Sequence, residues 1–163
     1  MKKVAILANL SANNGAAERK WEKLKKKLSH SSAFSRFQEP IYIEYHVPFD
    51  LQACLKDVVL KQGIKNIVSA GGDGSLNYLI NTLNQIPGID TEQLVIGGIG
   101  LGSSNDFLKP FQDKLENIPL KINYDRAYNH DIGLVKYEDV NGKVKKKYFL
   151  INASAGLIAH ANY

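Results

Sequence analysis

The sequence predicts an α/β protein with three layers, in which helices cover both faces of a parallel sheet. Short apolar runs alternate three times with segments of helical periodicity, and the connections between them are short. This alternation is typical of parallel strands joined by helical crossovers. A second observation is that glycine-rich turns follow two of the apolar runs. We expect residues 1–122 to form this domain.

The expected strands are apolar, short and bounded by turn residues. The run at 4–8 contains only apolar residues and is stopped by Asn9, which favours a buried strand. Further strands are expected at 41–47, 64–70 and 94–99.

The three expected helices lie between these strands. The first shows apolar residues at helical spacing, namely Ala17, Trp21, Leu24 and Leu28. Its lysines between positions 20 and 27 are expected to form a solvated face. The second helix is indicated by the apolar positions 51, 55, 58 and 59, and the third by positions 76, 79, 80 and 83.

The pattern changes after residue 110. Strands are expected at 118–122, 129–137 and 144–152, and Asn141-Gly142 is typical of a hairpin turn between the last two. Residues 123–163 are therefore expected to begin a second domain, a β-sandwich that continues in a longer protein.

The composition narrows the class of protein. With 44% hydrophobic and 23% charged residues, the chain of 163 residues is typical of a soluble globular protein. Its net charge of +5 is compatible with anionic partners such as nucleotides or acidic lipid surfaces. The single cysteine, Cys54, excludes an intramolecular disulfide and a cysteine-based zinc site. No apolar run approaches the length of a membrane span, and no nucleic-acid motif is present.

Seven of the 13 glycines lie in two clusters at expected strand ends, at 71–74 and 97–102. Glycine lets a backbone approach a ligand closely, and a helix that starts after the turn directs free amides at anions. The clusters therefore indicate a phosphate site. The alternative is a pair of tight turns in which Ser75 and Asp106 cap helices. A carboxylate inside the first cluster, Asp73, would repel phosphates unless it contacts a magnesium ion or accepts a hydroxyl proton.

These residues resemble the diacylglycerol kinase catalytic-domain superfamily, which includes bacterial lipid kinases and sphingosine kinases. "GGDGSLN" at 71–77 is similar to its GGDGT-type motif, and "GIGLGSSNDF" at 98–107 is similar to its P-x-G-T-x-N-D-F pattern. "NLSANNG" at 9–15 resembles the family's opening N-P-x-x-G, and "HDIG" at 130–133 and "FLINASAG" at 149–156 resemble the entry into its second domain.

The resemblance implies a nucleotide-binding α/β domain and a β-sandwich that closes over a lipid. Asp73 would be the catalytic residue, as a base or a metal-linked carboxylate. ATP and Mg²⁺ are the implied cofactors. The residues implied to bind the nucleotide are Asn9, Gly71, Gly72, Gly74, Ser75, Gly102, Ser103, Asn105 and Asp106.

We therefore expect the nucleotide-binding part of an ATP-dependent lipid kinase, which phosphorylates a lipid hydroxyl such as that of diacylglycerol or a sphingoid-like alcohol. The 163-residue piece by itself is expected to be inactive. A kinase of a soluble acceptor, as in NAD kinases, and a nucleotide-binding module without turnover are the alternatives. The expected location is the cytoplasm, with peripheral contact of the complete protein at the inner membrane face. A homodimer is one state that the sequence allows.

Overall fold

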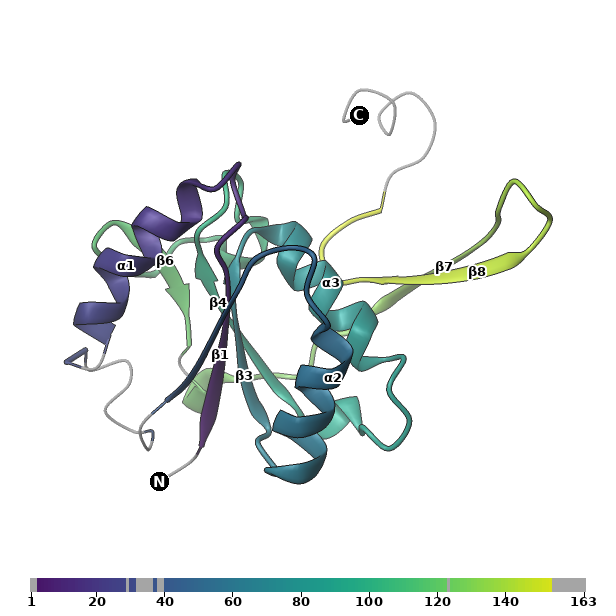
Figure 1. The fold of residues 1–163 in the computed structure, drawn as a ribbon, viewed down its shortest axis with the longest axis horizontal. Coiled ribbons are helices and arrows are strands. Elements are labelled where there is room, and N and C mark those ends of the chain that lie inside the picture. The colour runs from purple at the N-terminus through teal and green to yellow at the C-terminus, as the bar shows by residue number, and fades with distance from the viewer. Residues whose placement is uncertain (1–2, 29, 32–36, 38–39, 123, 154–163) are drawn as a thin grey trace. The chain divides into compact units, whose positions relative to one another are not determined.

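The computed structural model describes residues 3–28, 30–31, 37, 40–122 and 124–153 (Figure 1). The chain divides into two compact units, Met1–Tyr128 and Asn129–Tyr163. Among the residues that the structure describes, no helix is both long and apolar enough to cross a membrane.

A sheet of six strands forms the centre of the first unit, in the order β2-β1-β3-β4-β6-β5. The strands are β1 (Val4–Asn9), β2 (Ile41–Tyr45), β3 (Asn66–Gly71), β4 (Val95–Gly100), β5 (Asp113–Leu115) and β6 (Ile118–Lys121). The first four strands are parallel to one another. β6 pairs with β4 in the antiparallel direction, and β5 pairs with β6 in the same way.

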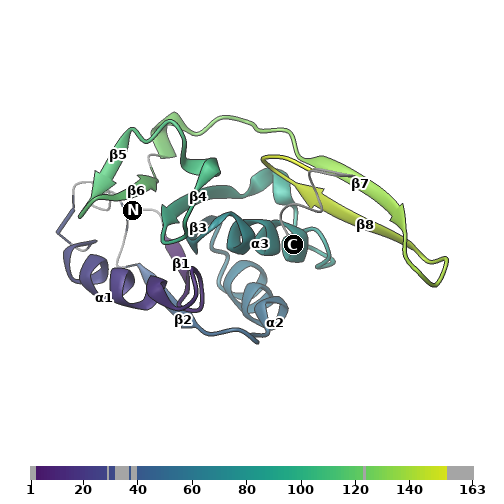
Figure 2. The ribbon, with the colours of Figure 1, turned by 90° about the horizontal axis from the view of Figure 1, so that it is seen from above.

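Helices cover both faces of this sheet, as the sequence predicts (Figure 2). α1 (Ala16–Leu28) lies on one face, and α2 (Leu51–Leu55) and α3 (Asp73–Leu83) lie on the other. Alternate residues of β1 divide between the two faces, as the geometry of a strand requires. Ile6 packs in the same apolar cluster as Trp21 of α1, whereas Ala5 packs with Val58 beside α2.

The second crossover is less regular than the sequence suggests. α2 ends at Leu55 and continues as a π-helix, η1 (Lys56–Lys61), instead of one α-helix through position 59. Three 3-10 helices, η2 (Thr91–Gln93), η3 (Asp106–Leu108) and η4 (Tyr124–Arg126), complete the described helical segments of this unit. The strand predicted at 64–70 begins at Asn66, whose buried side chain donates a hydrogen bond to the Lys3 carbonyl at 2.8 Å.

The sheet is not parallel throughout, because its last two strands, β6 and β5, run in antiparallel pairs. The sequence predicts a strand at 118–122 but neither its antiparallel pairing with β4 nor the short strand β5. β5 has only three residues, so it offers too few positions for an alternating pattern to be recognised. Glu116 and Asn117, with φ of 53° and 62°, turn the chain back between β5 and β6.

The described part of the second unit is a hairpin of β7 (Gly133–Glu138) and β8 (Val144–Phe149). Gly142 adopts a φ of +74° in the turn that the sequence predicts. Both strands are shorter than expected, because 129–132 and 150–152 lie outside the paired region. The predicted sandwich extends into 154–163, which lie outside the described residues.

Candidate functional site

The carboxyl ends of three neighbouring strands bring the candidate residues together. β3 lies between β1 and β4, and Gly71 is aligned with Gly100 across the β3–β4 pair. The loops after Asn9, Gly71 and Gly100 therefore leave the sheet together, at the carboxyl ends of their strands. In open α/β sheets, ligands bind outside the carboxyl ends of the strands. All ten residues singled out in the sequence lie in or beside these loops, while their binding roles stay predictions.

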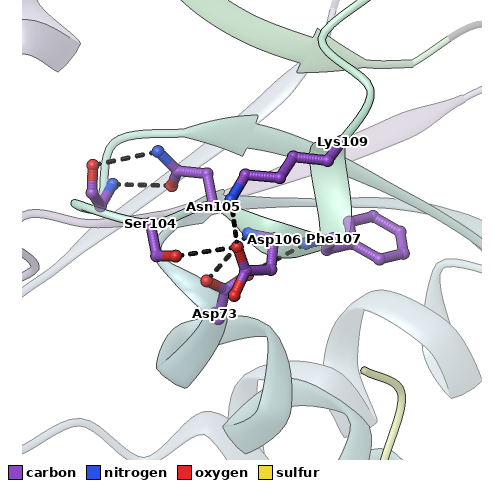
Figure 3. Close-up of polar contacts among 7 residues, drawn as sticks. Asp73, Ser104, Asn105, Asp106, Phe107 and Lys109 are labelled. Atoms are coloured by element: carbon purple, nitrogen blue, oxygen red, sulfur yellow. Dashed lines mark hydrogen bonds and ion pairs between the residues drawn. The ribbon is translucent and has the colours of Figure 1, made fainter. Parts of the chain in front are cut away.

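Asp73 joins the two glycine-rich loops through its carboxylate (Figure 3). Its Oδ2 accepts a hydrogen bond from the backbone N–H of Asp106 at 3.0 Å, and its Oδ1 accepts one from Phe107 at 3.2 Å. These two amides belong to the first turn of η3. The first N–H groups of a helix have no acceptor within the helix, so they need a partner from outside it. Asp73 therefore caps η3 from the start of α3, a contact between loops that the sequence reading did not anticipate.

Asn105 closes the second loop on itself (Figure 3). Its side-chain oxygen accepts a hydrogen bond from the Gly102 N–H at 3.1 Å, and its amide nitrogen donates to the Gly102 carbonyl at 3.0 Å. The residue is buried and adopts the left-handed conformation, with φ of 55°. Asparagine tolerates this conformation better than most residues. Asn105 thus fixes the shape of the loop. This structural role is enough to explain an asparagine at this position, and no bound ligand is needed for the explanation.

The glycines between the loops permit a close backbone approach. A Cβ on Gly102 would lie 2.5 Å from the Cα of Gly72, which no real structure accommodates without movement. The Gly71 carbonyl accepts hydrogen bonds from the amides of Leu101 and Gly102, at 2.9 and 3.2 Å. Packing between the two loops therefore explains Gly72 and Gly102.

Asn9 connects the loop after β1 to the two glycine-rich loops. Its amide nitrogen donates to the Ser75 hydroxyl at 2.9 Å, and its oxygen accepts from the Ser11 N–H at 3.1 Å. Ser75 is buried, and a side chain on Gly71 would overlap it. The hydroxyl of Ser75 is thus held inside the site.

Gly74 differs from the other glycines in this site. A Cβ at this position would have no heavy atom within 4 Å, and the residue is exposed in the first turn of α3. The amides of Ser75 and Leu76 both donate to the Gly72 carbonyl. The amides of Asp73 and Gly74 precede these bonds, so they have no partner within the helix. Neither packing nor backbone conformation requires glycine at position 74. An anion that approaches the amides of Asp73 and Gly74 closely would require it.

The exposed side of the second loop carries further polar groups (Figure 3). The Asp106 carboxylate accepts hydrogen bonds from Lys109 at 2.7 Å and from the Ser104 hydroxyl at 2.8 Å. The hydrogen bond from Lys109, and then that from Ser104, hold the pKa of the Asp106 carboxyl below its usual value. Ser103 is exposed beside this group.

Lys121 supports the second motif and was not identified from the sequence. Its Nζ donates to the Phe107 carbonyl at 2.7 Å and lies 4.8 Å from the centre of the Phe107 ring. Burial lowers the pKa of this amine. The available signal was a lysine at the end of a strand whose other residues are apolar, "IPLK" at 118–121.

The described residues contain no group of three or more histidine, cysteine, aspartate or glutamate side chains that would enclose a metal. Magnesium in phosphate sites needs fewer protein ligands, because it is bound by one or two carboxylates together with phosphate oxygens and water. Asp73 and Asp106 carry carboxylates on adjoining loops, and that of Asp106 is ion-paired with Lys109 at 2.7 Å. Carboxylate oxygens are the type of ligand that such an ion prefers.

Comparison with solved structures supports the same fold. Two solved structures, each of a proposed diacylglycerol kinase from Bacillus anthracis, match with TM-scores of 0.50 and 22% sequence identity. Each match covers 68% of this chain, and 33% and 36% of the two matched chains. The chain therefore spans about a third of the length of these structures. No match was found among curated proteins.

The family assignment comes from the sequence comparison with family models. Residues 3–133 match the model of the diacylglycerol kinase catalytic domain. This range holds both glycine-rich loops, Asp73 with the two amides that it accepts, and the whole six-stranded sheet. The chain belongs to the diacylglycerol kinase catalytic domain family.

Proposed function

We propose that the chain is the nucleotide-binding part of an ATP-dependent lipid kinase, which transfers the γ-phosphoryl group of ATP to a lipid hydroxyl such as that of diacylglycerol or a sphingoid-like alcohol. The observation that carries the proposal is the exposed first turn of α3. It places the amides of Asp73 and Gly74 beside a carboxylate, without a side chain at Gly74 to cover them. Amides at a helix N-terminus favour phosphate, and the helix dipole adds to the attraction.

The loop contacts make this turn rigid. Asp73 caps η3, Asn9 bonds Ser75, and Gly72 packs on Gly102, so three loops hold the turn in one arrangement. Rigid positioning matters because phosphoryl transfer depends mainly on the placement and electrostatic stabilisation of phosphates.

In the proposed reaction, the acceptor hydroxyl oxygen forms a bond to the γ-phosphorus, and the bond from that phosphorus to the β–γ bridging oxygen breaks. ADP leaves, and the hydroxyl proton passes to the Asp73 carboxylate. Each Asp73 oxygen accepts one backbone amide and keeps a further lone pair for a proton donor. Mg²⁺ held by Asp73 and Asp106 would neutralise charge on the phosphates.

Gly74→Ala tests nucleotide binding at this turn. The substitution replaces glycine in a helix, which stabilises the fold by up to about 1 kcal/mol. The added methyl group meets no protein atom but narrows the approach to the amides. We expect a higher melting temperature together with weaker ATP binding in calorimetry, and a larger loss of affinity for Gly74→Val. Unchanged ATP affinity in both variants would place the nucleotide elsewhere.

Turnover is tested in a protein that also contains an acceptor-binding part, with labelled ATP and either diacylglycerol in mixed micelles or NAD as acceptor. Phosphorylated lipid supports the proposal. Phosphorylated NAD would instead identify a kinase of a soluble acceptor. ATP binding without either product would identify a binding module. We propose a cytoplasmic location, with peripheral contact at the inner membrane face.

A further inference from the structure

The β7–β8 hairpin carries most of the net positive charge of the chain (Figure 1). Between Gly133 and Phe149 the sequence has five lysines and two acidic residues, which leaves a net charge of +3, against +5 for the whole chain. The five lysines are Lys136, Lys143, Lys145, Lys146 and Lys147. All five side chains are exposed.

The pairing of the two strands spreads this charge over both faces of the hairpin. Lys145 and Lys147 lie on one face, because alternate residues of a strand share a face. Lys136 and Lys146 lie directly opposite each other on the other face. Like charges in opposed positions destabilise a strand pair, so a bound anionic surface would offset a repulsion that the hairpin contains. Lysines on both faces also disfavour burial of either face of this half in an apolar core.

Little of this charge is neutralised within the hairpin. The Lys145 Nζ lies 3.7 Å from a carboxylate oxygen of Asp139. Among the residues that the structure describes, the other four lysines make no ion pair. The second acidic residue, Glu138, forms no ion pair with any of them. Four cations are therefore available to an anionic partner.

The turn of the hairpin presents apolar side chains beside these lysines. Val140 lies in the turn and is fully exposed, and the neighbouring Val144 is 65% exposed. Asp139 fixes the turn, because its Oδ1 accepts hydrogen bonds from the amides of Asn141 and Lys143, at 3.0 and 2.9 Å. The tip thus holds two branched apolar side chains without cover, on a backbone that is fixed by hydrogen bonds.

Lysines around exposed apolar side chains match the chemistry of an anionic membrane surface. Lysines are attracted to anionic headgroups, and apolar side chains enter the boundary between the headgroups and the acyl chains. Nucleic acid fits the tip less well, because its two apolar side chains are aliphatic and offer no ring on which a base stacks.

We propose that the tip of the β7–β8 hairpin docks on a bilayer that contains anionic phospholipids, with Val140 at the boundary and the lysines on the headgroups. The proposal rests on the membrane contact of the proposed function and assigns that contact to one surface. Its test uses neither ATP nor an acceptor, so the two proposals can fail separately.

The first test compares two triple variants of the whole chain. The hairpin variant carries the substitutions Lys136→Gln, Lys143→Gln and Lys146→Gln. The control variant removes the same charge from exposed positions of the first unit, through Lys3→Gln, Lys26→Gln and Lys56→Gln. Sedimentation measures binding to vesicles of phosphatidylglycerol with phosphatidylcholine, and circular dichroism compares the folds of the variants.

We expect the hairpin variant to bind these vesicles at least about tenfold more weakly than the wild type, since each lysine near an anionic surface contributes roughly fivefold. The control variant should lose little affinity, because charges farther than a Debye length from the surface are screened. Both triple variants should bind ATP as the wild type does, since none of their substitutions lies in the three loops of the candidate site.

Val140→Trp tests the apolar tip independently of the lysines. Trp21, the one tryptophan of the chain, is fully buried, so a change of emission on addition of vesicles reports on position 140. We expect the emission to shift to shorter wavelengths and to be quenched by brominated lipid. Leu60→Trp, at an exposed position of the first unit, should show neither change.

Three results would overturn the proposal. Equal loss of vesicle binding in both triple variants would show that only net charge matters. Vesicle binding without a change of emission at position 140 would place the membrane contact elsewhere. Absence of binding to the anionic vesicles would exclude the membrane as the partner, and an oligonucleotide that then binds through the hairpin lysines would identify nucleic acid instead.

Discussion

At the scale of single residues, Asp73 combines a structural role with a proposed chemical one. Its two oxygens accept the amides of Asp106 and Phe107, so the side chain organises the second loop whether or not a ligand is bound. In a simple helix cap, asparagine replaces aspartate at little cost. The observed bidentate contact changes this expectation, because asparagine has one acceptor oxygen and its amide nitrogen only donates.

Asp73→Asn should therefore lower both stability and turnover. We expect a loss of about 1 kcal/mol in urea unfolding, since one amide loses its acceptor. Phosphoryl transfer in a protein with an acceptor-binding part should fall by about 10²–10⁴, the usual contribution of a general base. Lys121→Met serves as the control, because it loosens the same η3 segment and leaves the carboxylate intact. If the two variants lose similar activity, Asp73 is a cap and not a base.

At the scale of elements, η3 is a short helix that is held by its neighbours as well as by its own backbone hydrogen bonds, from Leu108 to Asn105 and from Lys109 to Asp106. Asp73 accepts from its first amides, and Lys121 of β6 donates to the Phe107 carbonyl. A Cβ on Gly98 would lie 2.7 Å from Leu108, so β4 also makes room for η3. The second motif is thus positioned by contacts from α3, β4 and β6 together.

The pH dependence of stability should report on the Lys121 contact. Burial lowers the pKa of Lys121 in the folded protein, so the unfolded chain binds this proton more tightly than the folded chain. Wild-type stability should therefore rise relative to Lys121→Met as the pH increases through the lowered folded pKa toward the usual lysine value. Urea unfolding of both proteins from about pH 8 to about pH 11 measures this difference. A constant or falling difference would show that burial does not disfavour the charged amine.

At the scale of the whole molecule, the first unit contains the entire candidate site. The sheet, its covering helices and all ten candidate residues lie within Met1–Tyr128. The described part of the second unit is one hairpin, and isolated hairpins are marginally stable in water. Several apolar side chains of this unit are exposed, including Leu134, Tyr137 and Val144.

A chain that ends at Tyr128 should keep the fold and the nucleotide site. Among the described residues, the apolar clusters around Trp21 and Val58 include none after 128, so removal of residues 129–163 should leave the melting temperature and the ATP affinity of the first unit unchanged. Circular dichroism and calorimetry on the shortened chain measure both quantities. Loss of cooperative unfolding would mean that the hairpin contributes to the core, contrary to the division described here.

The sequence by itself determined the α/β class, the strands that carry the site and the positions of the two glycine-rich loops. These features depend on local patterns, namely apolar runs, helical spacing and glycine clusters at strand ends. It also placed Asp73 at a junction where a carboxylate needs a partner. Such patterns extend over a few neighbouring residues, so they can be read without knowing the fold.

Only the tertiary structure decided which groups meet. The hydrogen bonds that the amides of Asp106 and Phe107 donate to Asp73, and the contact of Lys121 with Phe107, each join segments that are separated in the sequence. The antiparallel pairing of β6 with β4 places Lys121 beside Phe107.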